Sequence, residues 1–552
     1  MRRSNARTRV DSKPKQMDPV KLQLRSNARP NLFARNPKSS RSNYLIIPLV
    51  LISLALFLCL AFFSGKSLHN SAKRKYRIII DGGSTGTRIH VFNYKVENGN
   101  AVFDFGKDGL ASMKVNPGLS SFAEEPDGAG NSVVELLEFG KGQIPKGSWR
   151  DTEIRLMATA GLRMLEVQVQ EQILESCRRV LHSSGFKFKD EWASVITGSD
   201  EGMYAWVAAN YALGSLGGDP LDTTGIIELG GASAQVTFIS SELVPSGFSR
   251  AVRFGNVTYD LYSHSFLHSG LDVALDSLRE ALISGDYKLG QILILYLVST
   301  AVQSLQKGLP TDPCTPKGYS HNVKSWKLSY GSPSERSHHP STIQTRGNFA
   351  ECRSAALMLL QKGKEQCSYQ RCDIGSTFVP KLQGKFLATE NFFYTSKFFG
   401  LEQKAFLSQL MTAGQEFCRE DWSNLQKKYH SVGEGDLLRY CFSSSYIVAL
   451  LHDSLGIALD DERIKVANQV GSVPLDWALG AFILLTTADS DVPNPGWVAT
   501  IISDDSHTLF SLVGVFILLI FAIWSISRWR KPQVKTIFDL EKGRYIVTRV
   551  GR

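Results

Sequence analysis

The chain lacks the motifs of two common nucleotide-binding folds and of structural zinc sites. It contains no GxxxxGK[ST] loop, and its glycine-rich stretches do not open helices as they do in dinucleotide-binding domains. It has no C-x-x-C pair, and its 11 histidines are scattered, which disfavours zinc. It also shows no short-period repeat, which argues against a solenoid or a propeller.

Net positive charge is missing from the body of the chain, although the whole chain of 552 residues carries +10. Residues 1–43 hold 12 Lys or Arg against two Asp, and residues 528–552 hold eight against two acidic residues. Subtracting these contributions of +10 and +6 from the total leaves −6 for residues 44–527. A body of this charge disfavours nucleic acid as a partner, and the polar, basic segment 1–43 is expected to be disordered.

Two stretches contain no charged residue at all, at 44–63 and 508–527. About 20 apolar residues suffice to cross the roughly 30 Å of bilayer hydrocarbon, so we expect transmembrane helices at 44–64 and 508–527. Both basic flanks lie outside the spans, which places the two tails, 1–43 and 528–552, in the cytosol and the body in a lumen or outside the cell. A cleaved signal peptide is the alternative for the first span, but the long segment before the apolar run argues against it.

Cysteine is scarce, with eight residues in the chain, and most of them lie late in the body. Cys59 falls in the first span, and Cys177 lies on an expected helix, where we predict a buried free thiol. The other six cluster between residues 314 and 441, which fits three disulfides in an oxidising compartment. Cys367 and Cys372 are close enough in sequence to pair locally. A sequon at Asn256 predicts N-glycosylation of the same body.

The most informative stretch is IIIDGGSTGTR at 78–88. Its β-branched apolar residues predict a buried strand, and residues 88–93 predict a second strand after a tight glycine turn. Free N–H groups and hydroxyls at such a tip suit a phosphate. Asp81, at the end of the first strand, suits a hydrated divalent cation that bridges the same phosphates. A glycine turn without any ligand is the alternative for one isolated motif.

A second copy of this pattern, GIIELGGASAQVTF at 225–238, weakens that alternative. It repeats the order of apolar strand, acid, two glycines, small hydroxyl residues and apolar strand. Two such hairpins, far apart in the chain, predict two similar lobes that each contribute one phosphate-binding tip to a shared cleft. The alternation of strands and helices predicts an α/β fold. Arg88 and Arg163 are candidate cleft cations, with surface or packing roles as the alternative.

Hydrolysis in such a cleft needs a base for water, and Glu201 is the candidate. It lies where a strand ends and a helix begins, which is where α/β folds place ligands, although an acid in the first helical turn commonly interacts only with the helix dipole. Glu201 would take a proton from water that attacks the terminal phosphorus. Ser233 and Gln235 would hold that water, and Thr159 would reach the transferred phosphoryl group.

Five segments follow one another along the chain: DGGSTGTR at 81–88, MATAGLRML at 157–165, GSDEGMYAWVAANY at 198–211, ELGGASAQ at 228–235 and LDWALGAF at 475–482. Taken in this order, they resemble the five apyrase regions of the apyrases, or nucleoside triphosphate diphosphohydrolases. This family includes cell-surface ecto-apyrases and Golgi nucleoside diphosphatases.

The resemblance implies a two-lobed actin-like (ribonuclease H-like) α/β fold, flanked by the N-terminal and C-terminal transmembrane helices. Lobe I would comprise 75–199 plus 468–500, and lobe II would comprise 200–467. The implied activity is hydrolysis of the terminal phosphate of nucleoside di- and triphosphates, with Ca2+ or Mg2+ as the cofactor.

Carried over residue by residue, Glu201 matches the family's catalytic glutamate, and Ser233 and Gln235 match its water-positioning pair. Asp81 and Glu228 match the acids that hold the metal through water. The phosphate-binding tips match at Ser84, Thr85, Gly86, Thr87, Gly230, Gly231, Ala232 and Ser233.

Tyr394 and Tyr440 resemble the family's aromatic residues that sandwich the nucleobase. Two positions depart from the family pattern, since Glu228 stands where Asp is usual and Ala234 where Thr is usual. The extra methylene of Glu228 moves its carboxylate outward by about 1.3 Å, so metal geometry or cation preference is expected to shift. The resemblance also implies the disulfides Cys314–Cys352, Cys367–Cys372 and Cys418–Cys441.

Two other functions compete with nucleotide hydrolysis. A polyphosphate hydrolase of the same fold would use related loops, but the aromatic pair favours a nucleobase. A membrane-tethered nucleotide binder without activity is disfavoured by the joint presence of Glu201, Ser233 and Gln235.

The length of the two spans favours the Golgi or another endomembrane over the plasma membrane. Homo-oligomerisation through the two transmembrane helices is a further possibility.

Overall fold

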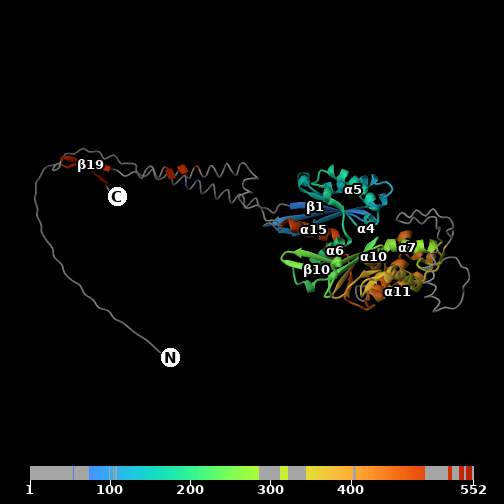
Figure 1. The fold of residues 1–552 in the computed structure, drawn as a ribbon. Coiled ribbons are helices and arrows are strands. Elements are labelled where there is room, and N and C mark those ends of the chain that lie inside the picture. The colour runs from blue at the N-terminus through green and yellow to red at the C-terminus, as the bar shows by residue number, and fades with distance from the viewer. Residues whose placement is uncertain are drawn as a thin grey trace, which may run out of the picture. The chain divides into compact units, whose positions relative to one another are not determined.

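The computed structural model describes residues 74–97, 100–103, 105, 109–284, 311–320, 343–401, 406–490, 534–539 and 543–549, with isolated positions at 52–54 and 517–524. It divides into one compact unit at Asn70–Gly496 and a second at Met1–His69 plus Trp497–Arg552 (Figure 1). In the second unit, β19 (Val534–Asp539) and β20 (Arg544–Arg549) form an antiparallel hairpin.

The predicted membrane spans at 44–64 and 508–527 lie outside the described residues, apart from the isolated positions, and so does the tail at 1–43. Among the residues that the structure describes, no helix is long and apolar enough to cross a membrane. The two spans and the topology that follows from them therefore stay predictions.

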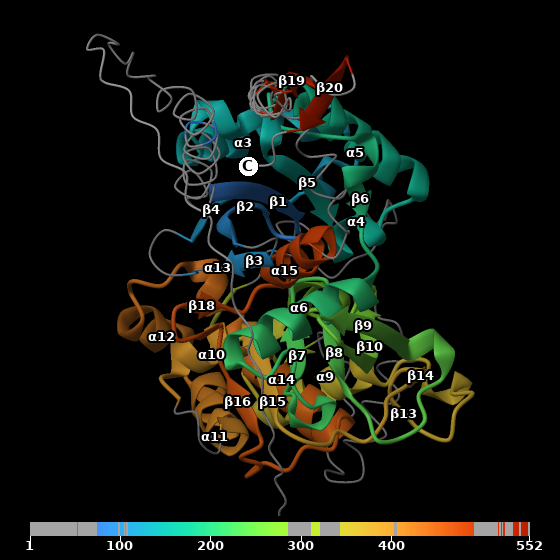
Figure 2. The same ribbon diagram turned by 90° about the vertical axis from the view of Figure 1, so that its left-hand side faces the viewer.

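The first sheet of the compact unit carries the first glycine hairpin. It is built from β1 (Arg74–Gly82), β2 (Thr87–Glu97), β3 (Asn100–Phe103), β4 (Leu110–Val115), β5 (Glu153–Ala158) and β6 (Ala193–Val195), in the order β3-β2-β1-β5-β6 with β4 paired to β2. β1 and β2 are antiparallel, which confirms the predicted hairpin, whereas β1, β5 and β6 are parallel. The outer face of this sheet is covered by α3 (Val134–Gln143) and α5 (Val167–His182) (Figure 2).

The second sheet carries the second glycine hairpin. It is built from β7 (Gly225–Leu229), β8 (Ser233–Ile239), β9 (Ser249–Phe254), β10 (Val257–Leu267), β15 (Phe386–Glu390) and β16 (Ile464–Val466), in the order β16-β15-β7-β8-β10-β9. β7 and β8 are antiparallel, as predicted. The helices α7 (Leu271–Ser284), α9 (Phe349–Leu360), α11 (Phe406–Arg419) and α14 (Tyr440–Val448) share one core with this sheet.

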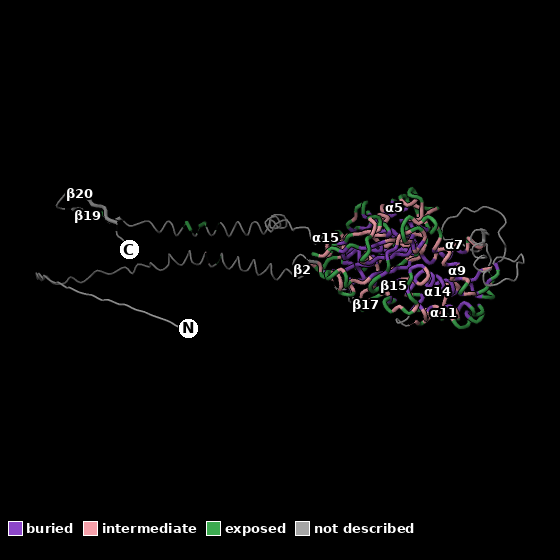
Figure 3. Tube along the Cα trace, turned by 60° about the horizontal axis from the view of Figure 1, so that its bottom comes forward, coloured by how far each residue is buried: buried purple, intermediate pink, exposed green. Residues whose placement is uncertain are grey.

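Two helices, α6 (Gly198–Leu213) and α15 (Trp477–Ser490), pack against each other between the two sheets (Figure 2). They cross closely, since a Cβ on Gly480 would lie 1.8 Å from the carbonyl oxygen of Tyr204. Their buried residues join one core that reaches both sheets and runs through the body (Figure 3). Because α6 and α15 pack against both sheets, the core does not mark a boundary between the lobes. The limits of lobe I, 75–199 plus 468–500, and of lobe II, 200–467, therefore stay predictions.

The start of α6 is fixed by Thr197. The helix begins at Gly198, and the Thr197 hydroxyl accepts a hydrogen bond from the backbone N–H of Asp200 at 3.1 Å. Thr197 takes the cap because its extended backbone lets the side chain turn back onto the first helical turn. This start places Glu201 in the first turn, at the edge between the sheets.

The cysteine predictions are confirmed. Disulfides join Cys314 to Cys352, Cys367 to Cys372 and Cys418 to Cys441. Cys177 is free and buried on α5, and burial raises the pKa of its thiol to about 12. Such a thiol is inert at neutral pH because the reactive form is the thiolate. The sequon residue Asn256 is exposed in the turn between β9 and β10.

Stability is expected to fall at acid pH because of His264 on β10. Its ring packs between Phe248 and Phe266, with centroids at 5.1 and 4.8 Å, and burial lowers its pKa to about 4. The unfolded chain binds this proton near pH 6.5, so stabilisation is complete above 6.5 and is lost as the pH falls towards 4. Between pH 7 and pH 5 we expect a loss of about 2 kcal/mol in unfolding free energy. Denaturant titration of His264→Leu should remove that part of the pH dependence; an unchanged slope would contradict the assignment.

Candidate active site

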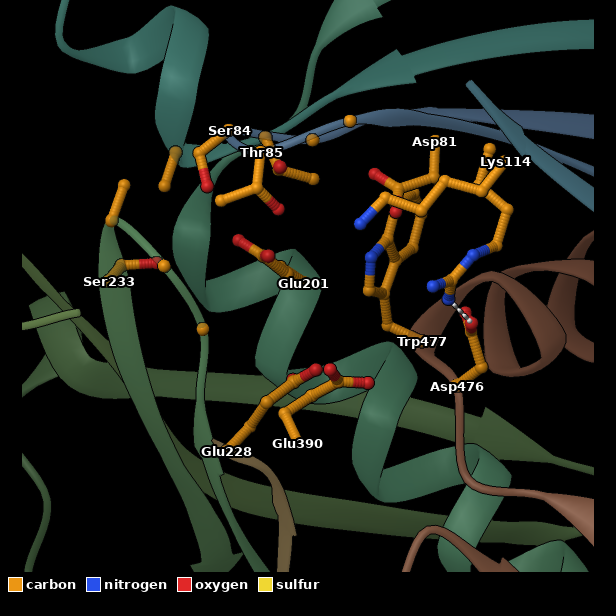
Figure 4. Close-up of a pocket in the computed structure, with 18 residues that line it drawn as sticks. Asp81, Ser84, Thr85, Lys114, Glu201, Glu228, Ser233, Glu390, Asp476 and Trp477 are labelled. Carbon is orange, nitrogen blue, oxygen red and sulfur yellow. Dashed lines mark hydrogen bonds and ion pairs between the residues drawn. The ribbon is translucent and has the colours of Figure 1, made fainter. Parts of the chain in front are cut away.

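The two glycine tips meet at one cavity of about 110 Å³ between the sheets (Figure 4). The turn between β1 and β2 supplies one wall, and the turn between β7 and β8 supplies the other. Most of the predicted site residues line this cavity: Asp81, Ser84, Thr85, Gly86, Thr159, Glu201, Glu228, Gly230, Gly231, Ala232 and Ser233. The structure therefore brings together residues that are up to 152 positions apart in the sequence, from Asp81 to Ser233.

The second tip is anchored through its carbonyl oxygens. The carbonyl of Gly230 accepts from the N–H of Leu271 at 2.9 Å, and the carbonyl of Gly231 accepts from those of Asp272 and Val273 at 2.9 and 3.1 Å. These donors are the otherwise unpaired N–H groups at the start of α7. The tip is thus fixed from behind, and its opposite side faces the first tip across the cavity.

Glu201 is held at the cavity by an ion pair. The Arg163 guanidinium, at the end of α4 (Ala160–Arg163), lies 2.6 Å from Oε2 of Glu201 and donates to Oγ of Ser233 at 3.4 Å. The amide of Gln235 donates to Ser233 Oγ at 2.6 Å and to Ser265 Oγ at 3.1 Å. The predicted base and the two predicted water-positioning residues therefore form one network. Arg163 links them, and Ser265, which the sequence did not suggest, orients the amide.

Burial raises the pKa of Glu201, while the charge of Arg163 and hydrogen bonds from Arg163 and Gln235 oppose this rise. Arg163→Gln should therefore raise the pKa of Glu201 further and deplete its carboxylate form. We expect the acid limb of kcat to move to higher pH, with kcat about tenfold lower for each pH unit below that limb and recovery as the pH is raised. A smaller loss is expected for Arg163→Lys, which keeps the charge. The pH dependence of kcat measures this, and an acid limb at its wild-type position in Arg163→Gln would contradict it.

The two predicted metal-shell acids sit deep in the cavity. Glu228 is 7% exposed, and Oδ1 of Asp81 and Oε2 of Glu228 are buried without a hydrogen-bond partner in the described part of the chain. Burial, followed by the charges of neighbouring acids, raises the pKa of both carboxyl groups well above the ordinary range. Unpaired buried carboxylate oxygens are costly unless a ligand satisfies them. Within the described residues no group of three or more His, Cys, Asp or Glu is placed to hold a metal ion, which fits acids that act through water.

The far end of the cavity contains residues that the sequence did not single out. Lys114, Glu390, Asp476 and Trp477 line it together with Arg88 (Figure 4). Arg88, one of the two candidate cleft cations, lines the cavity and donates to Asp476 at 3.3 Å. Asp476 lies within the apyrase-like segment at 475–482 and directly precedes α15. An acid just before a helix in such a segment is a signal that could have identified it from the sequence. Lys114 and Glu390 carry no local signal.

Four predicted residues do not line the cavity: Gln235, which contacts the cavity-lining Ser233, and Thr87, Tyr394 and Tyr440. Thr87 is fully buried in β2, opposite Gly82, and does not line the cavity, so its predicted phosphate contact gains no support. Tyr394 is 47% exposed, and its phenol is influenced by the charge of Glu390. Tyr440 stacks on Phe398 with ring centroids 3.5 Å apart and meets Phe399 and Phe417 edge-on at 6.0 and 6.4 Å, so its contact with a base stays a prediction.

The geometry defines a class of protein: a two-lobed, actin-like α/β protein with two glycine tips at one cavity and a buried carboxylate between them. Residues 67–494 match the GDA1/CD39 (nucleoside phosphatase) family. The chain belongs to this family and is a nucleoside phosphohydrolase, which confirms the resemblance seen in the sequence.

Individual relatives agree with this assignment. The chain is 55% identical over 567 aligned residues to "Probable apyrase 6" of Arabidopsis thaliana, with both chains fully covered. It is 27% identical over 508 residues to ectonucleoside triphosphate diphosphohydrolase 1 of Bos taurus, covering 87% of this chain and 94% of the relative. Among solved structures, nucleoside triphosphate hydrolases from Neospora caninum superpose with a TM-score of 0.55 at 18% identity, over 79% of this chain and 98% of that one, which supports the shared fold.

Proposed function

We propose that this protein hydrolyses the terminal phosphate of nucleoside di- and triphosphates, using water activated by Glu201 and a divalent cation. The observation that carries the proposal is the convergence of Glu201 with both glycine tips in one cavity, where it joins the Arg163–Ser233–Gln235 network. A base must reach the attacking water by one hydrogen bond. Glu201 has this reach because it lines the same small cavity as the tips.

The roles of the other residues follow from their positions. The tips, with the hydroxyls of Ser84 and Thr85 and the backbone of Gly231 and Ala232, bind the phosphate chain. Ser233 and Gln235 orient the water, and Glu201 takes its proton as the water attacks the terminal phosphorus. Thr159, which is 5% exposed and lines the cavity beside Gly82, contacts the transferred phosphoryl group.

Asp81 and Glu228 fit a hydrated Ca2+ or Mg2+ because each presents a buried carboxylate oxygen without a protein partner. They would accept hydrogen bonds from the water molecules of the cation rather than ligate it directly. When bound, such an ion neutralises the charge of the phosphate chain and of the leaving phosphate. Glu228 retains this role in place of Asp because contact through water tolerates a longer side chain.

Removal of divalent cations is expected to lower phosphate release by at least roughly 10²-fold, since charge neutralisation contributes several kcal/mol to phosphoryl transfer. Activity with UDP and ATP should be measured after chelation and after titration with Mg2+ or Ca2+. Circular dichroism provides the control that the fold persists. Full turnover by folded, chelated protein would refute the cation requirement.

A substrate comparison tests the nucleotide assignment. We expect phosphate release from UDP and ATP and little from inorganic polyphosphate, because the exposed ring of Tyr394, with Tyr440 as its predicted partner, offers a surface on which a base can stack. Faster release from polyphosphate would favour the alternative hydrolase. Tight nucleotide binding without turnover, across several cations, would favour a binding protein.

We also propose that the body is anchored by two membrane helices with both tails in the cytosol, in the Golgi or another endomembrane. Three disulfides support an oxidising compartment for the body, and the exposed Asn256 is open to glycosylation. A glycosidase-sensitive mass shift that is lost in Asn256→Gln, together with protease protection of the body in sealed vesicles, tests this topology. Cleavage of the body in intact vesicles would contradict it.

A further inference from the structure

Glu390 has a backbone conformation that is rare for a residue with a side chain. It ends β15 and precedes α10 (Asn391–Phe399), with φ of 60° and ψ of −118°. Such a backbone is strained for any residue other than glycine and persists only where its surroundings impose it. Here the N–H of Glu390 donates to Oδ1 of Asn468 at 2.7 Å, and the side chain of Asn391 donates to the carbonyl of Leu229 at 2.9 Å.

The strained backbone turns the Glu390 side chain into the cavity. In the parallel pairing of β15 with β7, Thr389 lies opposite Glu228, and Glu390 lies opposite Leu229. Regular alternation along the strand would send Glu228 and Glu390 to opposite faces of the sheet. Instead both carboxylates extend into the same part of the cavity (Figure 4), and the charge of Glu390 contributes to the raised pKa of both Glu228 and Asp81.

No protein cation pairs with the Glu390 carboxylate in the described residues. Arg88 is engaged with Asp476 at 3.3 Å, and Lys114 makes no ion pair within the described ranges, although both lie close enough to act on Glu390 through their charge. The oxygens of Glu390 thus face the same space as the unpartnered Oε2 of Glu228 and Oδ1 of Asp81. Glu228 is more than nine-tenths buried, so this space must receive a ligand that supplies positive charge or hydrogen-bond donors.

We propose that Glu390 is a third carboxylate of the divalent-cation site, where it joins Asp81 and Glu228 in accepting hydrogen bonds from the water molecules of the cation. This inference rests on the proposed function. Glu228 and Glu390 come from the paired strands β7 and β15 and lie side by side, whereas Asp81, at the end of β1, faces them from the other sheet (Figure 4). Because all three contacts are made through the cation's water molecules, the third acid should strengthen the binding of hydrated Ca2+ and Mg2+ alike.

The test is cation binding, which does not depend on turnover. Trp477 lines the cavity and can sensitise the luminescence of Tb3+ used as a calcium analogue, with Ca2+ and Mg2+ as competitors on the full-length protein. In Glu390→Gln we expect the dissociation constants of Tb3+, Ca2+ and Mg2+ to rise by on the order of tenfold. Glu462→Gln, an exposed acid of the same lobe, is the matched control and should bind as the wild type does.

Glu390→Gly separates the carboxylate from the strain. Glycine accepts this backbone, so the apparent Tm should stay level or rise by about 1–3 °C, while cation binding should fall as far as in Glu390→Gln. Wild-type cation affinity in a stable Glu390→Gly protein would overturn the proposal. It would also be overturned if Glu390→Gln kept its cation affinity and lost only the preference for ribonucleotides over 2′-deoxyribonucleotides, since the carboxylate would then bind the sugar.

Two further variants distinguish this inference from the proposed function. Asp81→Asn and Glu228→Gln should weaken Tb3+ binding under the proposed function alone. If they do so and Glu390→Gln does not, the third carboxylate is refuted and the proposed function stands. If none of the three variants changes Tb3+ binding, the cation lies elsewhere, and both the inference and the proposed cation role are refuted.

Discussion

Glu201→Gln is expected to lower kcat for nucleoside diphosphate hydrolysis by at least about 10³-fold while changing nucleotide affinity by only a few-fold. Glutamine keeps the size of the side chain and can still contact Arg163, but it cannot accept a proton from water. General bases contribute roughly 10²–10⁴-fold to rates. Asp81 and Glu228 are not expected to replace Glu201 as the base, because in the proposed mechanism they accept hydrogen bonds from the water molecules of the cation. The tips that bind the phosphates are untouched by the substitution.

Single-turnover phosphate release and calorimetric binding of a nucleotide separate the two effects. Glu462→Gln, on the surface of the same protein, makes the same chemical change outside the cavity and should keep full activity. A further comparison is Glu201→Asp, which keeps a base but withdraws it by one methylene, and should retain more activity than Glu201→Gln. Near-wild-type kcat in a folded Glu201→Gln protein would rule out Glu201 as the base.

The parts of the site that could be predicted from the sequence are those made by neighbouring residues. Each hairpin is a local pattern in which apolar residues form a buried strand and glycines permit the turn. For this reason Asp81, Ser84 and Thr85 could be placed together before any tertiary structure was considered, as could Glu228 and Ser233. The second copy of the pattern then implied the shared cleft.

The parts that could not be predicted depend on contacts between distant segments. Arg163 meets Glu201 only because α4 and the start of α6 follow adjacent parallel strands, β5 and β6. Lys114 reaches the cavity because β4 pairs with β2 and its side chain then lies over Gly86. Glu390 enters through a positive φ, which no residue pattern signals for a glutamate. Thr87 is the opposite case: the local pattern placed it at the phosphate-binding tip, whereas strand pairing with Gly82 buries it.

The charge of the cavity explains why these missed residues matter. Asp81, Glu201, Glu228, Glu390 and Asp476 all line a space that must accept a polyanionic substrate. Arg88 and Arg163 are each committed to one acid, at 3.3 and 2.6 Å, so Lys114 is the cavity-lining cation without an ion pair in the described residues. A bound cation therefore offsets the repulsion between these acids and the nucleotide, so cation and nucleotide should each raise the affinity of the protein for the other. Because five acids line the cavity and not only Asp81 and Glu228, this increase in affinity should be larger than those two acids alone would give.

Gly231→Ala is expected to lower kcat/KM by roughly 10²-fold because the two tips approach each other at this residue. A Cβ on Gly231 would lie 2.7 Å from Oδ2 of Asp272, 2.8 Å from Oγ of Ser84 and 3.0 Å from Cγ2 of Thr85. Asp272 cannot easily retreat, since it is in contact with Arg439, so the first tip must move away. A displacement of the phosphate chain by about 1 Å relative to Glu201 and its water costs on the order of 10² in rate.

Gly230→Ala supplies the graded comparison for Gly231→Ala. Its Cβ would meet only the carbonyl oxygen of Ser233, at 3.2 Å, so a loss of less than tenfold is expected. Gly142→Ala, at an exposed position with no atom within 4 Å, should leave activity unchanged. Steady-state kinetics on UDP, with thermal unfolding to check the fold, measures all three variants. Equal effects of Gly230→Ala and Gly231→Ala would show that the spacing between the tips does not control the reaction.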